Sequence, residues 1–124
     1  MKVLLVDDEE DIRKIGRLSL EAVGKFKVML AASASEALSL ARSDPPDLIL
    51  MDMMMPGMDG LSALAELQSD AALNAIPVLF MTAKVQRSEI DHYLSVGAIG
   101  VIQKPFDPMT LPAEIKRIMD ARPR

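Results

Sequence analysis

The chain has 124 residues, of which half are hydrophobic, a net charge of -4 and no cysteine. This composition is typical of one folded domain, and it excludes a disordered chain, a disulfide framework, a thiolate metal site and a cysteine nucleophile. The acidic balance argues against direct binding to nucleic acid, and no apolar run reaches the length of a membrane span or signal peptide, so we expect a cytoplasmic domain without membrane contact.

Short apolar runs alternate with segments of helical periodicity along the whole chain. Runs that are apolar at consecutive positions are typical of strands buried on both faces. The five predicted strands cover residues 3–6, 26–31, 48–51, 77–81 and 100–103. A loop with turn residues is expected over 52–60.

Each predicted strand is followed by a predicted helix. The helices cover residues 12–23, a segment between Ser33 and Pro45, a segment from Leu61 to Leu67, roughly 88–96, and a last segment ending near Ala121. Ser33 and Glu36 have the spacing of a capping box, and Gly24 and Gly97 supply helix stops. Pro108 and Pro112 leave the start of the last helix open, because proline is excluded from helix interiors.

Strict alternation of strand and helix indicates an α/β fold. We expect a doubly wound, five-stranded parallel sheet with helices on both faces and right-handed crossovers. Such sheets bind ligands beyond the carboxyl ends of their strands. The residues that directly follow each apolar run are therefore the candidates for chemistry.

Polar or ionisable residues follow four of the five apolar runs. They are Asp7 and Asp8 (with Glu9 and Glu10), Asp52, Thr82 and Lys104. Carboxylates that converge on one crevice repel one another unless a positive charge lies among them, and Lys104 and a divalent cation are the two candidates. An oxygen-only ligand set favours a hard ion, magnesium more than zinc. A carboxylate nucleophile, a metal ion, a lysine and a hydroxyl together suit phosphoryl transfer.

Five fragments in this order resemble the receiver domain family of two-component response regulators. They are Asp7-Asp8, the segment 50–60 (LMDMMMPGMDG), Thr82-Ala83, Gly97-Ala98 and Lys104-Pro105-Phe106. The resemblance covers nearly the whole chain and implies a single receiver domain over residues 1–124. It also implies the flavodoxin-like (CheY-like) strand order 2-1-3-4-5, which alternation alone does not specify.

The resemblance assigns a role to each candidate. Asp52 is the expected phospho-acceptor, and Asp8 and Asp52 are expected to bind Mg2+ directly, with Asp7 acting partly through water. Mn2+ is expected to substitute for Mg2+. Met54 is expected to add its backbone carbonyl to the metal site.

Two further residues are expected to bind the phosphoryl group. Thr82 is expected to bond one of its oxygens and Lys104 to pair with another. The Lys104–Pro105 peptide bond is expected to be cis.

By the same resemblance, the phosphoryl donor is a sensor histidine kinase or a phosphotransfer protein. Phosphorylation then switches a face made of the fourth helix, fifth strand and fifth helix, which binds a downstream protein target or output domain and also suits a homodimer. The expected protein is a signalling receiver that catalyses only its own phosphorylation and dephosphorylation.

One position departs from the family pattern. The family usually has Tyr or Phe three residues before the lysine, where this chain has Val101. A valine has no ring to move between the surface and the pocket. The signal is therefore transmitted by movement of the fourth helix, by another residue, or without a large conformational switch. Lys84, two residues after Thr82, is a second open point, because its charge is either near the phosphoryl group or solvated.

Two other functions and one structural role also fit part of the pattern. A haloacid-dehalogenase-type phosphatase also uses an aspartyl phosphate, but it places a second Asp two residues after the nucleophile, where Asp7 has Glu9. A pseudo-receiver that never takes phosphate remains open because of Val101. Asp7 and Asp8 are alternatively helix caps.

The methionine-rich loop and the single histidine also have ordinary interpretations. The methionines around Asp52 are expected to pack and anchor the loop and not to bind copper. His92 is expected to be a surface or core residue and not a phosphohistidine.

Overall fold

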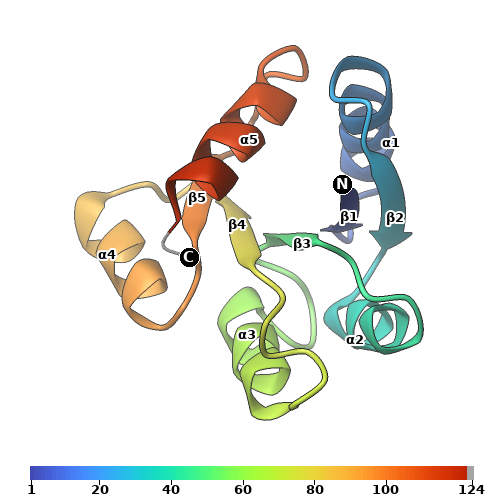
Figure 1. The fold of residues 1–124 in the computed structure, drawn as a ribbon. Coiled ribbons are helices and arrows are strands. Elements are labelled where there is room, and N and C mark those ends of the chain that lie inside the picture. The colour runs from blue at the N-terminus through green and yellow to red at the C-terminus, as the bar shows by residue number, and fades with distance from the viewer. Residues whose placement is uncertain (123–124) are drawn as a thin grey trace.

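The computed structural model describes residues 1–122 of the chain. Its strands are β1 (Lys2–Val6), β2 (Lys27–Ala31), β3 (Leu48–Asp52), β4 (Val78–Thr82) and β5 (Gly100–Gln103). They form one parallel sheet in the order β2-β1-β3-β4-β5, which confirms the expected doubly wound topology (Figure 1).

Helices cover both faces of this sheet. They are α1 (Glu10–Leu18), α2 (Ala34–Ser43), α3 (Gly60–Ser69), α4 (Arg87–Ser95) and α5 (Leu111–Ala121). Side chains alternate between the faces along each strand, so every central strand contributes to two cores. Ile49 and Phe80 pack with α2, α3 and α4, whereas Leu50 and Leu79 pack with α5.

The periodicity predicts one continuous helix over residues 12–23, but the structure has a break in this segment. It passes at Ser19 into a π-helical turn, η1 (Ser19–Val23), in which the Gly24 N–H donates to the Ser19 carbonyl five residues earlier. The buried Ser19 hydroxyl donates to the carbonyl oxygen of Pro108. The turn therefore places a polar side chain where a distant loop satisfies it.

Local signals elsewhere fix the helix ends. The Ser33 hydroxyl accepts the Glu36 N–H, as the capping-box spacing predicts. Gly97 has a φ of 114°, a conformation that favours glycine and ends the segment after α4. In α5, Pro112 lies in the first turn, where its missing N–H costs no helical hydrogen bond.

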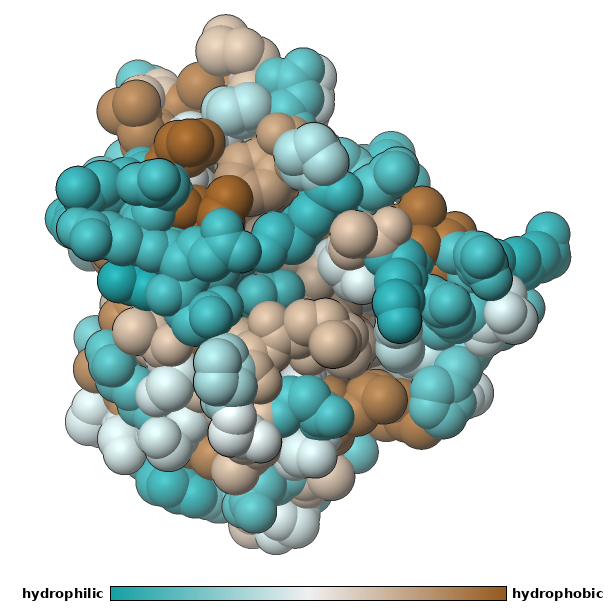
Figure 2. Space-filling model, turned by 180° about the vertical axis from the view of Figure 1, so that it is seen from behind, coloured by the Kyte–Doolittle hydropathy of each residue, from teal (hydrophilic) through white to brown (hydrophobic). Residues whose placement is uncertain are grey.

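Strands β3 and β4 extend one residue further than the apolar runs indicate. Asp52 and Thr82 are their last residues, so both functional candidates are held by the sheet itself. No helix among residues 1–122 is long and apolar enough to cross a membrane. Figure 2 shows one side of the surface as hydrophilic over much of its area, with hydrophobic residues gathered in small groups.

Candidate functional site

The candidate residues meet at the carboxyl edge of the sheet. Asp7 directly follows β1, Asp52 ends β3, Thr82 ends β4, and Lys104 directly follows β5. Because all five strands are parallel, these positions share one edge, as the sequence predicts.

Three carboxylates form a compact cluster at this edge. Asp7, Asp8 and Asp52 each offer one oxygen, and these oxygens lie within 4.8 Å of one another. Asp7 is fully buried and Asp52 is 4% exposed, whereas Asp8 is exposed. The cluster therefore has a buried floor and one ligand atom at its mouth.

Lys104 supplies the positive charge that such a cluster requires. Its Nζ lies 3.0 Å from Oδ2 of Asp7 and 3.5 Å from Oδ1 of Asp52. Burial acts to lower the pKa of Lys104, but the hydrogen bond to Asp7 and the charges of Asp52, Asp7 and Glu9 outweigh it and raise this pKa. The lysine is therefore held as a cation facing two carboxylates.

Backbone contacts orient Asp7. Its Oδ1 accepts the Glu9 N–H at 2.9 Å, and its carbonyl oxygen accepts the Arg13 guanidinium N–H at 2.8 Å. Helix α1 has Glu9 at its N-cap position, and no side chain makes a capping hydrogen bond there. The helix-cap interpretation of Asp7 and Asp8 therefore does not describe their contacts.

The environment of Asp52 disfavours its charged form. Burial raises its pKa and the charge of Asp7 raises it further, while Lys104 and the Met54 N–H act in the opposite direction. The Met54 N–H lies 3.3 Å from Oδ1 of Asp52. An additional cation at the cluster would offset the charge of Asp7, which is the second cause of the raised pKa after burial.

Thr82 is tied to the same edge through its backbone. Its carbonyl oxygen accepts the Lys104 N–H at 2.9 Å, which links the ends of β4 and β5. Its hydroxyl oxygen accepts the Lys84 N–H at 3.1 Å and retains its own proton for donation. The Lys84 side chain is exposed. The Lys104–Pro105 peptide bond is cis, as expected.

A cavity of about 270 Å³ opens above these residues. It is lined by Glu9, Asp52, Met54, Thr82, Ala83 and Lys104. Glu9 lines this cavity, although the sequence assigns it no role. Its position directly after the two aspartates is the signal that could have indicated it. The Met54 side chain is 67% exposed at the same cavity.

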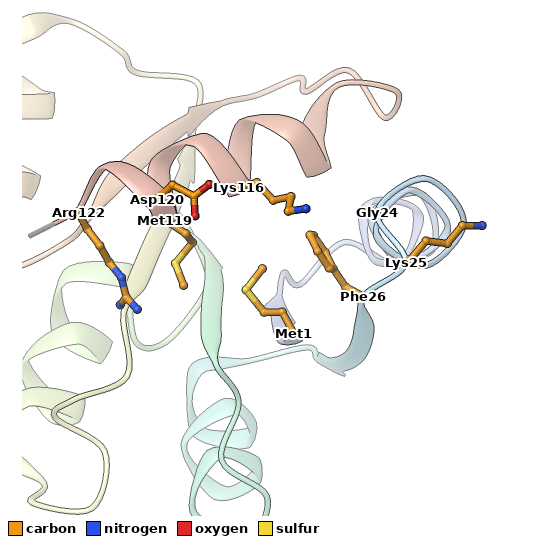
Figure 3. Close-up of a pocket in the computed structure, with 8 residues that line it drawn as sticks. All are labelled: Met1, Gly24, Lys25, Phe26, Lys116, Met119, Asp120 and Arg122. Carbon is orange, nitrogen blue, oxygen red and sulfur yellow. The ribbon is translucent and has the colours of Figure 1, made fainter. Parts of the chain in front are cut away.

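A larger cleft, about 680 Å³, lies at the other edge of the sheet. Met1 and Phe26, which precede β1 and β2, line it together with Met119 and charged residues of α5 (Figure 3). Strand polarity places this cleft across the sheet from the carboxylates. It therefore takes no part in the site.

The methionines near Asp52 divide into two groups. Met51, Met53 and Met55 are buried in the core, as packing residues are expected to be, whereas Met54 is exposed. His92 is exposed on α4, so of the two expected positions, surface or core, it occupies the surface.

Comparison with known proteins identifies the family of the chain. Residues 3–116 match the family model described as response regulator receiver domain. Response regulator Rre1 of Synechocystis is 37% identical over 96% of this chain and 52% of its own length. The alkaline phosphatase synthesis transcriptional regulatory protein PhoP of Bacillus subtilis is 36% identical over 95% of the chain and 48% of its own length. The chain thus spans about half the length of these curated relatives.

Solved structures show the same fold. The chemotaxis response regulator CheY4 of Vibrio cholerae superposes with a TM-score of 0.86 at 32% identity, over 94% of this chain and 97% of its own. The N-terminal domain of a response regulator receiver protein from Methanoculleus marisnigri gives a TM-score of 0.77 at 34% identity, with 98% of each chain covered. The chain therefore belongs to the response regulator receiver domain family and is a receiver domain of two-component signalling.

Proposed function

We propose that residues 1–124 act as one receiver unit whose phospho-acceptor is Asp52. The observation that carries this proposal is the position of its carboxylate. Asp52 is nearly buried, ends a central strand, and has both the Asp7–Asp8 carboxylates and the Lys104 ammonium beside it. This combination provides a nucleophile and stabilises the charge that develops when a phosphoryl group is transferred.

The donor set fits a hard divalent cation, Mg2+ or alternatively Mn2+. Asp7, Asp8 and Asp52 offer only carboxylate oxygens, and the backbone carbonyl of Met54, two residues after Asp52, would be a further ligand. Burial and the charge of Asp7 raise the pKa of Asp52, and a bound cation would offset the charge contribution. When bound, the cation supplies charge neutralisation for the carboxylates and the transferred group.

The chain's own residues position the reaction. An Asp52 oxygen forms the new bond to phosphorus while the phosphorus–nitrogen bond of a phosphohistidine breaks, and the electron pair returns to the imidazole nitrogen of the donor. Lys104 faces Asp52 and is placed to pair with a phosphoryl oxygen. Thr82 has a hydroxyl proton free to donate to another.

We propose a sensor histidine kinase or phosphotransfer protein as the donor and a cytoplasmic setting. The phosphorylated form then binds a downstream target, an output domain or a second copy through the face made of α4, β5 and α5. The curated relatives are about twice as long as the matched region, which supports an output domain as one class of target. The domain acts on its own Asp52 and not on free phosphate monoesters, so a chromogenic monoester should show negligible turnover.

Intact-mass measurement tests the assignment. Incubation with acetyl phosphate and Mg2+ should add one phosphoryl group to the unaltered protein, and chelation of the metal should prevent the gain. Asp52→Ala should abolish the gain, whereas Asp11→Ala, an exposed position on α1, should retain it. The same gain in Asp52→Ala, or none in the unaltered protein, would contradict the proposal.

A further inference from the structure

Helix α4 buries few of its side chains. Of its nine residues, all described, Tyr93 alone is buried, at 7% exposure. Leu94 and Val96, its apolar neighbours, are 43% and 37% exposed. An element with so little buried apolar contact is held weakly and opens at low free-energy cost.

The partner of Tyr93 connects it to the functional site. The Tyr93 ring meets the Phe80 ring edge-on, with centroids 5.8 Å apart and planes at 70°. Phe80 precedes Thr82 by two residues in β4, so both side chains lie on the same face of the sheet. A displacement of the end of β4 at Thr82 therefore acts on the surface against which Tyr93 packs.

The neighbouring strand, β5, has no aromatic side chain beside Phe80. Val101 in β5 is the register partner of Phe80 and packs only partly buried against the same core. The ring that covers Phe80 from this side is supplied by the helix and not by β5.

A second residue of α4 makes the docked position costly. Glu89 lies one helical turn before Tyr93, so both occupy the same face of the helix. Its Oε2 is shut off from solvent and has no hydrogen-bond partner within residues 1–122. A carboxylate oxygen in that position loses its hydration without compensation, and outward movement of α4 would restore it.

We propose that Tyr93 is the movable aromatic of this receiver domain, docked on Phe80 before phosphorylation and released from it afterwards. The inference rests on the proposed function, because the release begins when Thr82 turns toward a phosphoryl group on Asp52. The movement of β4 loosens the Phe80–Tyr93 contact, and hydration of Glu89 favours the undocked helix. Tyr93 thereby couples the site to α4 where Val101 lacks a ring.

The composition of the chain allows a direct test. Tyr93 is the only tyrosine and there is no tryptophan, so tyrosine emission and the fluorine signal of incorporated 3-fluorotyrosine both report on this one residue. After treatment with acetyl phosphate and Mg2+, the fluorine resonance should shift toward its position in the unfolded protein, and acrylamide should quench the emission more strongly. Mg2+ alone, and Asp52→Ala with both reagents, should leave the two signals unchanged.

Mass measurement on the same samples separates the two ways in which the test fails. A phosphoryl gain with unchanged Tyr93 signals overturns the inference and leaves the proposed function standing. No phosphoryl gain overturns both.

The contribution of Glu89 is tested with a matched pair of charge-removing variants on the same helix. Glu89→Gln should slow amide hydrogen exchange in α4 of the unphosphorylated protein, because a neutral amide is less costly to bury. Asp91→Asn, whose side chain is 65% exposed, should not. Equal exchange rates in the two variants would remove Glu89 from the mechanism.

Discussion

The Lys104 ammonium nitrogen lies 3.0 Å from Oδ2 of Asp7, although 97 positions separate the two residues in the chain. Asp7 is fully buried and the lysine side chain is only 17% exposed. The pair joins the ends of β1 and β5, which do not adjoin in the sheet. Charge balance in the site therefore depends on a contact that only the complete fold creates.

Replacing this lysine should destabilise the fold. Lys104→Met keeps most of the side-chain volume but leaves Asp7 and Asp52 without their cation, and removal of one partner from a buried pair costs about 3 kcal/mol. Urea unfolding should show this loss, and Mg2+ should restore part of it because the ion neutralises the same carboxylates.

Lys14→Met is the control for that measurement. Lys14 pairs with Glu10 on the surface, with side chains 71% and 69% exposed. Exposed pairs contribute about 0.5 kcal/mol or less. Equal losses in the two variants would mean that the buried pair has no special contribution.

Asp52→Asn should raise the free energy of unfolding of the metal-free protein. The pKa of Asp52 is raised by burial and by the charge of Asp7, so the folded state binds its proton more tightly than the unfolded state does. Ionised Asp52 therefore lowers stability above its folded pKa, and this penalty fades as pH falls toward the ordinary aspartate pKa. The advantage of the variant at neutral pH should shrink over the same interval.

Magnesium should reverse that order. The parent gains about 2.7 kcal/mol when the ion is present at a hundredfold excess over its Kd, whereas the variant lacks one ligand. Asp59→Asn is the control, because the Ser62 N–H lowers the pKa of Asp59 and asparagine caps helices equally well. Stabilisation by Asp59→Asn as large as that by Asp52→Asn would contradict the argument.

Gly97→Ala should be strongly destabilising. Gly97 has a φ of 114°, and an added Cβ would lie 2.1 Å from Nε2 of Gln68, which donates to the Val96 carbonyl at 2.9 Å. Backbone strain and the broken bridge between α3 and the end of α4 together should cost about 2 kcal/mol or more. Thermal unfolding measures the difference.

Gly57 offers a control with a similar backbone and free space. Its φ is 83°, and no atom lies within 4 Å of an added Cβ. Gly57→Ala should lose only the backbone component, about 1 kcal/mol. Identical losses would show that the Gln68 bridge contributes nothing.

Leu18→Ser should slow phosphoryl transfer from a histidine kinase. Leu18 and Ile15 on α1 are 69% and 45% exposed, and Met109 is 69% exposed next to Pro108, whose carbonyl bonds Ser19. Exposed apolar side chains on α1 and on the loop that follows Lys104 suit a docking partner. The loss of one anchor should reduce the transfer rate roughly tenfold, equivalent to about 1.4 kcal/mol.

Labelling by acetyl phosphate separates docking from chemistry, because this small donor needs no protein surface. Its rate should be unchanged in Leu18→Ser. Leu94→Ser, at an exposed position of α4, is the matched substitution and should leave kinase transfer unaffected. Parallel losses with both donors would place the defect in the site and not in docking.

The sequence predicts the layout of the site because topology does most of the work. Four polar residues end apolar runs, and parallel strands place such ends on one edge whatever the strand order. Alternation does not specify that order, since right-handed crossovers allow more than one arrangement. The order came from family resemblance, and the structure confirms it.

Features that depend on contacts between distant segments were not predictable. The break at Ser19 coincides with a hydrogen bond to the carbonyl oxygen of Pro108, far away in the chain. The missing ring at Val101 is visible in the sequence, but the Phe80–Tyr93 contact requires the register of β4 and the angle of α4. Periodicity alone gives Tyr93 no distinction from any other buried helical residue.

Strands β3 and β4 are covered on both faces, whereas α4 has one buried side chain, that of Tyr93. Amides of the central strands should therefore exchange with solvent only on global unfolding, and those of α4 by local opening. The Asp52 carboxylate and the Thr82 hydroxyl are therefore expected to lie in a layer that opens only with the whole domain, whereas α4 opens locally. Thermal fluctuation can thus move α4 away from the sheet many times while the site at the carboxyl edge of the sheet stays folded.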